Sequence, residues 1–393
     1  GRTEHRTRNR QDSFWTWREM MYSAAMRLEP EDIYDASRMA FLEMALSGIT
    51  TVGEFHYLHH QPNGKPYDDP NLMAKAVVRA AQDVGLRIAL LRVAYARSGY
   101  GMKSDRQQAR FIEGDPQLYL EHISQLKSDL SGNDRAWVGL APHSVRAVPL
   151  EYLKQISHFA GVAKLVVHMH VAEQPAEVLA CQEEYSLSPI SLLQRLGLLN
   201  DRFTAVHAIH VTPAEVFELG AARASVCACP TTERNLGDGV VPVDDLFEAD
   251  VSVCLGTDSH IQIDLLEDAR ELEYHLRLQK MQRSILAPAS EKISALAQRL
   301  FACATNNGAK SLGYSGGSLE PSTPADFFTV DLNDPSIAGA STEVLLPAIV
   351  FSLARSAIRD VVVNGHIIVE QGRHKDQDEI VTRFNALQKR LWN

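Results

Sequence analysis

Seven short apolar stretches, each followed by a longer mixed stretch, dominate the chain up to about residue 260. They are rich in β-branched residues and apolar almost throughout, which is typical of strands buried on both faces of a sheet. They occupy residues 49–55, 86–95, 136–142, 164–170, 203–209, 224–230 and 251–258. Because strands that alternate with helices form parallel sheets with the helices outside, this pattern predicts an α/β fold.

Helix signals fill the segments between these strands. The clearest is "PEDIYDASRMAFLEMALSG", with Pro30 near its start and Gly48 after its end. Further helices are predicted at roughly 70–84, 116–130, 149–158, 188–196, 212–221 and 264–281. No G-x-G-x-x-G or Walker A motif follows a strand, which disfavours a nucleotide-binding doubly wound sheet. We therefore predict a (β/α)₈ TIM-type barrel in which one strand–helix unit is missing or lies upstream of Gly1.

The composition of the chain changes after residue 310. Turn-forming residues become frequent, and "AIRDVVVNGHIIVEQGRH" predicts a hairpin that turns at Asn364-Gly365. We predict a catalytic barrel over 1–310, a small β-sandwich appendage over 311–375 and a terminal helix over 376–393.

Charge and cysteine content narrow the class of protein. With 39 Lys and Arg against 49 Asp and Glu, the net charge of −10 gives no basic footprint for nucleic acid. No apolar run of about 18 residues predicts a membrane span, and no signal peptide is recognisable. The five cysteines are odd in number and form no Cys-x-x-Cys pair, so we expect reduced thiols in a cytoplasmic protein.

Polar residues gather at the ends of the predicted strands, where the chemistry of such barrels takes place. They are Glu54, His56, His143, His170, His207, Glu233 and Asp258. Buried charged groups need a partner, and a divalent metal would supply one.

The stretch "KLVVHMHVAEQP" contains the first half of a possible metal site. His170 ends the strand as a candidate ligand, and Glu173 is placed to move protons without binding the metal. His168 shares the face of His170 but lies about 6–7 Å away along the strand, so we place it deeper in the barrel. Asp258 is either a helix N-cap or an oxygen ligand and base. His207 ends a strand in the same way, whereas we place His210 in a loop.

Taken together, these residues resemble the metal-dependent amidohydrolase superfamily in its deaminase branch. Within that branch, "SFWTWREMMY", "EFHYLHHQPNGKPYDDP", "YARSGYG", "APHSVRAV", "CPTTERNLGDG" and "LEDARELEYHLRL" are similar to the N-formimino-L-glutamate deiminases. The resemblance implies hydrolysis of a formimino group to a formyl group and ammonia in histidine degradation. It also implies one divalent metal, zinc or alternatively iron, a small dianionic substrate and a possible homodimer.

The resemblance further implies roles for individual residues. His170 and Asp258 would be the third and fourth metal ligands, Glu173 the proton shuttle, and His207 a contact of the attacking oxygen. Substrate-binding positions match Arg18, Tyr57, His143 and Arg146, and arginine suits carboxylates because it binds them through two hydrogen bonds. From the residues alone, Arg18 could equally stack between tryptophans on a helix surface, and Tyr57 could serve packing. The histidines at 56, 59 and 60 could hold a second metal or form a polar loop, and we favour the loop.

One feature departs from the family pattern. Such barrels begin with a strand that ends in His-x-His and supplies two metal ligands, but here His5 stands in a polar stretch with Thr7 two residues on. We expect that first strand and the early sandwich strands to lie upstream. The alternatives are a related deaminase of another amidine, a guanidine or a nucleobase, and a non-catalytic barrel that has lost its metal.

Overall fold

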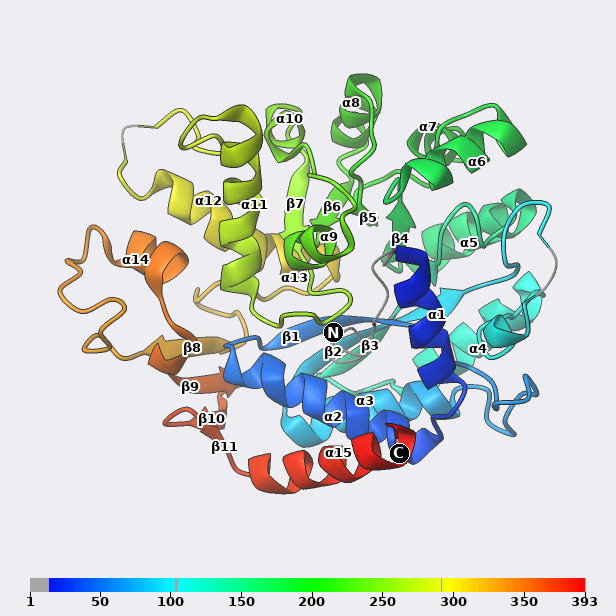
Figure 1. The fold of residues 1–393 in the computed structure, drawn as a ribbon, viewed down its shortest axis with the longest axis horizontal. Helices are drawn as coiled ribbons and strands as arrows, with labels where there is room; N and C mark the ends of the chain where they lie inside the picture. Colours follow the sequence, from blue (N-terminus) through cyan, green and yellow to red (C-terminus); the bar gives the residue numbers. More distant parts are fainter. Residues whose placement is uncertain (1–13, 103–104, 291, 393) are drawn as a thin grey trace.

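A parallel sheet of seven strands forms the centre of the molecule (Figure 1). The computed structural model describes residues 14–102, 105–290 and 292–392. The strands pair in chain order, β1 to β7. They are β1 (Thr51–His56), β2 (Arg87–Ala94), β3 (Ala136–Pro142), β4 (Val167–Val171), β5 (Phe203–His207), β6 (Ser225–Ala228) and β7 (Ser252–Leu255). All seven predicted strands are confirmed, with ends that shift by a few residues.

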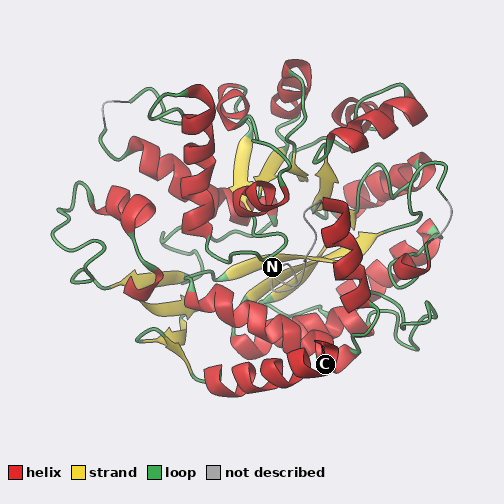
Figure 2. Ribbon diagram, in the orientation of Figure 1, coloured by secondary structure: helices red, strands yellow, loops and turns green. Residues whose placement is uncertain are grey.

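Helices surround this sheet on its outside (Figure 2). They are α1 (Phe14–Ala25), α2 (Pro30–Leu46), α3 (Leu72–Val84), α4 (Pro116–Asp129), α5 (Leu150–Ala163), α6 (Pro175–Tyr185), α7 (Pro189–Arg195), α8 (Pro213–Ala221), α9 (Pro230–Leu236), α10 (Val243–Glu248), α11 (Leu265–Lys280), α12 (Ala295–Ala304), α13 (Asn306–Ser311), α14 (Leu345–Ser352) and α15 (Gln377–Trp392), with short 3₁₀ turns η2 (Arg106–Gln108) and η3 (Arg355–Ala357). The predicted helices are present, and α6, α9, α10 and α12–α14 are additional. This arrangement is that of a TIM-type barrel.

The sheet curls but is not closed within the described residues. β1 and β7 are its two edges, and neither pairs with a further strand there. A cavity of about 1010 Å³ is lined by residues of both edge strands, including Val52 and Glu54 of β1 and Cys254 of β7. The described residues therefore form the seven parallel strands expected from the sequence.

A small antiparallel sheet lies beside the barrel. Its order is β11 (Arg373–His374), β10 (His366–Glu370), β9 (Ile358–Val363) and β8 (Phe327–Val330). The predicted hairpin is confirmed, because Asn364 and Gly365 take the positive φ angles of 53° and 76° between β9 and β10. The buried Arg87 of β2 ties this sheet to the barrel through Asp326, with 2.8 Å between Nε and Oδ2.

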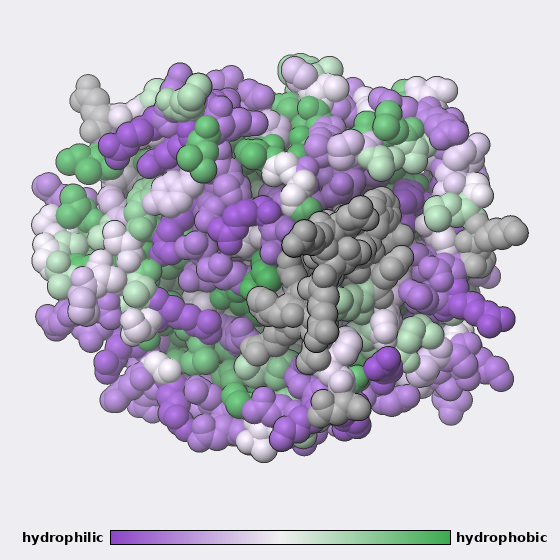
Figure 3. Space-filling view, in the orientation of Figure 1, coloured by the Kyte–Doolittle hydropathy of each residue, from purple (hydrophilic) through white to green (hydrophobic). Residues whose placement is uncertain are grey.

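Hydrophilic and hydrophobic residues are both present on the surface of the described part of the molecule. Hydrophilic residues cover much of the face in Figure 3, with hydrophobic groups between them. Within the described residues, no helix combines the length and the apolar character needed to cross a membrane. The apolar core extends through the strands and the inner faces of the helices.

Candidate active site

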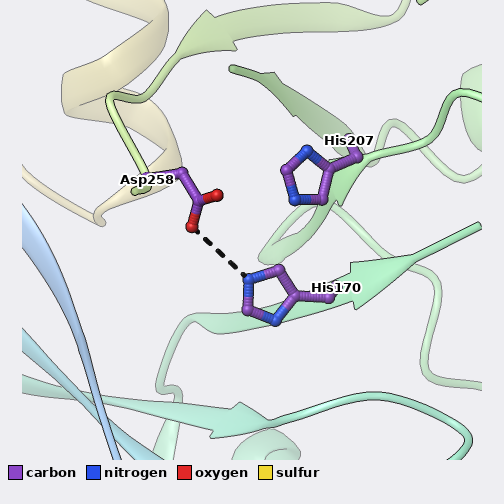
Figure 4. A group of neighbouring side chains, drawn as sticks. All are labelled: His170, His207 and Asp258. Carbon is purple, nitrogen blue, oxygen red and sulfur yellow. Dashed lines mark ion pairs between the residues drawn. The ribbon is translucent and has the colours of Figure 1, made fainter. Parts of the chain in front are cut away.

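Three polar side chains meet where the parallel strands end (Figure 4). His170 comes from β4, His207 ends β5 and Asp258 follows β7, and their ligand atoms all lie within 4.8 Å of one another. His170 Nε2 is 4.0 Å from Asp258 Oδ1. The backbone turns sharply here, with φ angles of 72° at His207 and 37° at Asp258. Non-glycine residues seldom adopt such angles, and strain of this kind concentrates at functional sites.

His207 lies among carboxylates. Its Nδ1 is 3.1 Å from Glu233 Oε1, and its Nε2 is 3.5 Å from Glu173 Oε1. Burial alone would lower the pKa of His207, but the negative charges of Glu173, Glu233 and Asp258 outweigh it and raise the pKa to about 10. Nε2 is buried and has no hydrogen-bond partner in the described part of the chain. The cluster thus has an excess of negative charge that a cation would balance.

His170 and Asp258 are arranged as a donor pair. His170 Nδ1 lies 3.2 Å from the backbone oxygen of His143, which leaves Nε2 directed toward Asp258. A ligand histidine is commonly fixed in this way through its other nitrogen. Burial would raise the pKa of Asp258, but the hydrogen bond from His170 and the charge of His207 hold it at about 2. Asp258 is therefore an anion at neutral pH, and the donor set fits a divalent cation.

Two glutamates near this cluster were not predicted as site residues. Glu233, which the sequence marked only as a polar strand-end residue, lies in the first turn of α9, and its Oε1 accepts a hydrogen bond from the Cys229 backbone at 2.8 Å as well as facing His207. Glu177 lies in the first turn of α6, and its Oε2 accepts from the Glu173 backbone at 3.2 Å. The local signal in each case is an acidic residue two or three positions after the proline that begins a helix.

Predicted substrate positions lie along the same cavity. Tyr57, His143 and Arg146 all line it together with His170 and Glu173. The ring centres of His143 and His170 are 5.0 Å apart, and those of Tyr57 and His143 are 5.7 Å apart. Arg146 Nη1 donates to the Ser98 backbone oxygen at 2.9 Å, and no carboxylate of the described residues pairs with its guanidinium.

Arg18 lies in α1, but its side chain is outside the described part of the chain, as are His5 and Thr7. The histidines at 56, 59 and 60 form a group of their own, with ring centres 5.8 Å apart for His56 and His59 and 6.3 Å apart for His59 and His60. His59 and His60 face the backbone oxygens of Val93 and Ile112 at 2.8 and 3.0 Å, and burial lowers the pKa of both. Burial lowers the pKa of His56 to about 4.

His168 lies deeper in the barrel than His170, as expected, and its Nε2 faces the Ser311 backbone oxygen at 2.8 Å. His210 follows β5 in a loop, where it faces the backbone of Asp238. The two described groups with metal-binding potential are His170–His207–Asp258 and His207–Cys229–Glu233. The hydrogen bonds of Glu233 already account for the second group, so the first is the better metal site.

Comparison with known proteins shows which family the chain belongs to. The amidohydrolase family model matches residues 4–368. The chain is 36% identical to the formimidoylglutamate deiminase of Pseudomonas aeruginosa over 96% of this chain and 82% of that protein. It is 28% identical to a 5-methylthioadenosine/S-adenosylhomocysteine deaminase of Pyrococcus abyssi, over 93% and 79% of the two chains.

Solved structures give the same result for the fold. An amidohydrolase from Brucella melitensis superimposes with a TM-score of 0.92 at 33% identity, over 100% of this chain and 86% of that one. A zinc-bound adenosine deaminase from Xanthomonas campestris, at 22% identity over 96% and 79% of the chains, shares the fold with a TM-score of 0.80. With its barrel, its strand-end cluster and the family match over most of its length, the chain belongs to the amidohydrolase family.

Proposed function

We propose that this protein hydrolyses N-formimino-L-glutamate to N-formyl-L-glutamate and ammonia. The observation that carries the proposal is the presence, in one cavity, of the His170–Asp258 cluster and of Arg146, which has no carboxylate partner among the described residues. The first suits hydrolysis of a C–N bond, and the second suits a carboxylate of the substrate. The similarity to the Pseudomonas aeruginosa enzyme supports the same substrate.

His170 and Asp258 would hold a divalent metal, with zinc favoured over iron because imidazole nitrogen and carboxylate oxygen are common zinc donors. When bound, such a cation supplies the Lewis acidity that promotes ionisation of water at neutral pH. A further strand that carried a His-x-His pair would fit along the open edges of β1 and β7, where the cavity is bounded by both strands.

The side chains divide the proton transfers between them. Asp258, an anion at neutral pH, accepts a proton from the attacking water. Glu173 passes that proton to the terminal nitrogen of the amidinium substrate after the C–O bond forms. Ammonia then leaves as the C–N bond breaks, and the hydroxyl group gives its proton back to Glu173 as it becomes the formyl oxygen. His207 lies beside Glu173 and Asp258 and donates a hydrogen bond to the oxygen that gains charge.

The two carboxylates of the substrate require cations at the far end of the cavity. Arg146 would bind one through its free N–H groups, and Arg18 of α1 would bind the other. Tyr57 and His143 would form the wall between Arg146 and the reacting carbon. A cytoplasmic location is part of the proposal, supported by the five free cysteines, and a homodimer is to be tested by light scattering.

A substrate panel tests the proposal. The zinc-loaded protein is assayed for ammonia release from N-formimino-L-glutamate, guanine, cytosine and adenosine, the last chosen because the Pyrococcus relative is named for adenosine derivatives. We expect a preference for N-formimino-L-glutamate of at least about 100-fold in kcat/KM. A preference for a nucleobase or nucleoside would favour the related deaminase. Failure to bind zinc, with no activity, would favour a non-catalytic barrel.

A further inference from the structure

Glu177 brings to the cavity a carboxylate that the proposed proton transfers do not use. It is in the first turn of α6, and its Oε2 accepts a hydrogen bond from the Glu173 backbone N–H at 3.2 Å. Its other oxygen, Oε1, is buried and has no hydrogen-bond partner among the described residues. The side chain lines the same cavity as Glu173 and Arg146. Because a buried acceptor without a donor is costly, this atom suits a donor that a ligand supplies.

The charges around Glu177 indicate which kind of donor fits. Burial and the neighbouring charge of Glu173 raise the pKa of Glu177 to about 7, against the opposing influence of Arg146 and His170. Arg146 does not pair with it, because its guanidinium donates to the backbone oxygen of Ser98. Glu173 and Glu177 are adjacent carboxylates, and Glu177 has no cation partner among the residues that the structure describes. The pair therefore favours a ligand group that is positively charged.

We propose that Glu177 determines specificity by accepting, through Oε1, a hydrogen bond from the N–H of a positively charged amidinium substrate. The inference rests on the proposed function and deepens it. In a formimidoyl amino acid, the substituted N–H lies one bond from the reacting carbon and one bond from the carbon that bears a carboxylate. Glu177 likewise interacts with both parts of the site. It accepts a hydrogen bond from the backbone of Glu173, the proposed proton-transfer residue, and it feels the charge of Arg146, the proposed carboxylate-binding residue.

The charge of the ligand distinguishes substrate from product at this position. The substrate is an amidinium, whereas N-formyl-L-glutamate presents the N–H of a neutral amide. The Glu177 carboxylate can accept a charge-assisted hydrogen bond from either ligand. Only the substrate adds an attraction between opposite charges, which is strong in a buried site, so Glu177 should favour substrate over product. The quantity to measure is the ratio of the product inhibition constant to the KM of the substrate.

Glu177→Gln is a sharp test of this preference. The glutamine oxygen can still accept from the Glu173 backbone, so the substitution changes mainly the free atom of the side chain. We expect KM for N-formimino-L-glutamate to rise about 10-fold, product inhibition to weaken less, and the ratio to fall at least about 5-fold. kcat should stay within about 3-fold. Glu183→Gln, at an exposed position of the same helix, is the matched control and should leave the ratio unchanged.

The outcomes separate this inference from the proposed function. If the wild-type protein hydrolyses the amidine but Glu177→Gln leaves the ratio unchanged, or raises both constants equally, the role of Glu177 is overturned and the proposed function stands. If the wild-type protein releases no ammonia from the amidine, the proposed function fails and the inference falls with it. Should Glu177→Gln lose its fold by circular dichroism, Glu177→Asp takes its place, and an unchanged ratio there again overturns the role.

Discussion

Replacing Glu173 by glutamine isolates the proton-transfer step. The carboxylate is 15% exposed, its Oε1 lies 3.5 Å from His207 Nε2, and it is not one of the three clustered donors. Glutamine keeps the size of the side chain but cannot exchange a proton. General acid–base groups contribute about 10²- to 10⁴-fold to rate, so we expect kcat to fall by that factor, or about 3–5 kcal/mol of barrier.

The assay is steady-state ammonia release, combined with metal analysis of the same sample. Glu173→Gln should retain the metal content of the wild-type protein, because His170 and Asp258 are unchanged. KM should change little, since Glu173 acts on the reacting nitrogen rather than on the carboxylates. A kcat within about 3-fold of wild type, at equal metal content, would refute the role of Glu173. A parallel loss of metal would instead identify it as a ligand.

Three further substitutions, and Gly161→Ala as a control, test the carboxylate site and the fold. Arg146→Met should raise KM for the dianionic substrate about 10-fold or more, and an equal effect on a neutral amidine would exclude a carboxylate contact. Glu113→Gln should destabilise the fold by about 3–5 kcal/mol in urea unfolding, because it leaves the buried Arg92, 2.6 Å away, without its anion. Burial would raise the pKa of Glu113, but His122 and Arg92 hold it far below its ordinary 4.5. The contribution of Glu113 to wild-type stability should therefore be complete above pH 4.5 and decline as the pH falls below it. If Glu113→Gln lost stability in acid as the wild type does, this reasoning would be contradicted. Gly220→Ala should destabilise the fold by about 1–3 kcal/mol, because the added Cβ would lie 2.1 Å from the Ala249 backbone oxygen. Gly161→Ala is the control and should not destabilise the fold, because its added Cβ meets no atom within 4 Å. Equal melting temperatures for the two variants would refute the close approach of Gly220 to Ala249.

The fold was largely predictable because the buried strands carry a strong local signal. Residues 136–142 are apolar throughout and form β3 with the predicted bounds. α6 was missed because it buries only Cys181 among its residues and so has little apolar periodicity. α9 and α10 have seven and six residues, too few for the periodicity to show.

Only those residues of the candidate site that directly follow an apolar strand could be predicted from the sequence. His170, His207 and Asp258 were marked by their positions after apolar strands, and the structure brings them together. The contact of Glu233 with His207 joins residues 26 apart on different elements, which no local pattern reports. The sequence likewise does not show that Oε1 of Glu177 is buried beside the cavity without a hydrogen-bond partner among the described residues, because this depends on how the cavity forms. The roles of Arg18 and Tyr57 stay predictions.

Product analysis in ¹⁸O-labelled water is the most direct test of the central claim, that this chain hydrolyses the C–N bond to the terminal imine nitrogen. The zinc-loaded protein is incubated with N-formimino-L-glutamate, and the products are quantified by mass spectrometry and ammonia assay. We predict one ammonia for each N-formyl-L-glutamate, with ¹⁸O in the formyl group and no turnover after metal removal. Release of formamide and glutamate, or no turnover by the metal-loaded protein, would contradict the account.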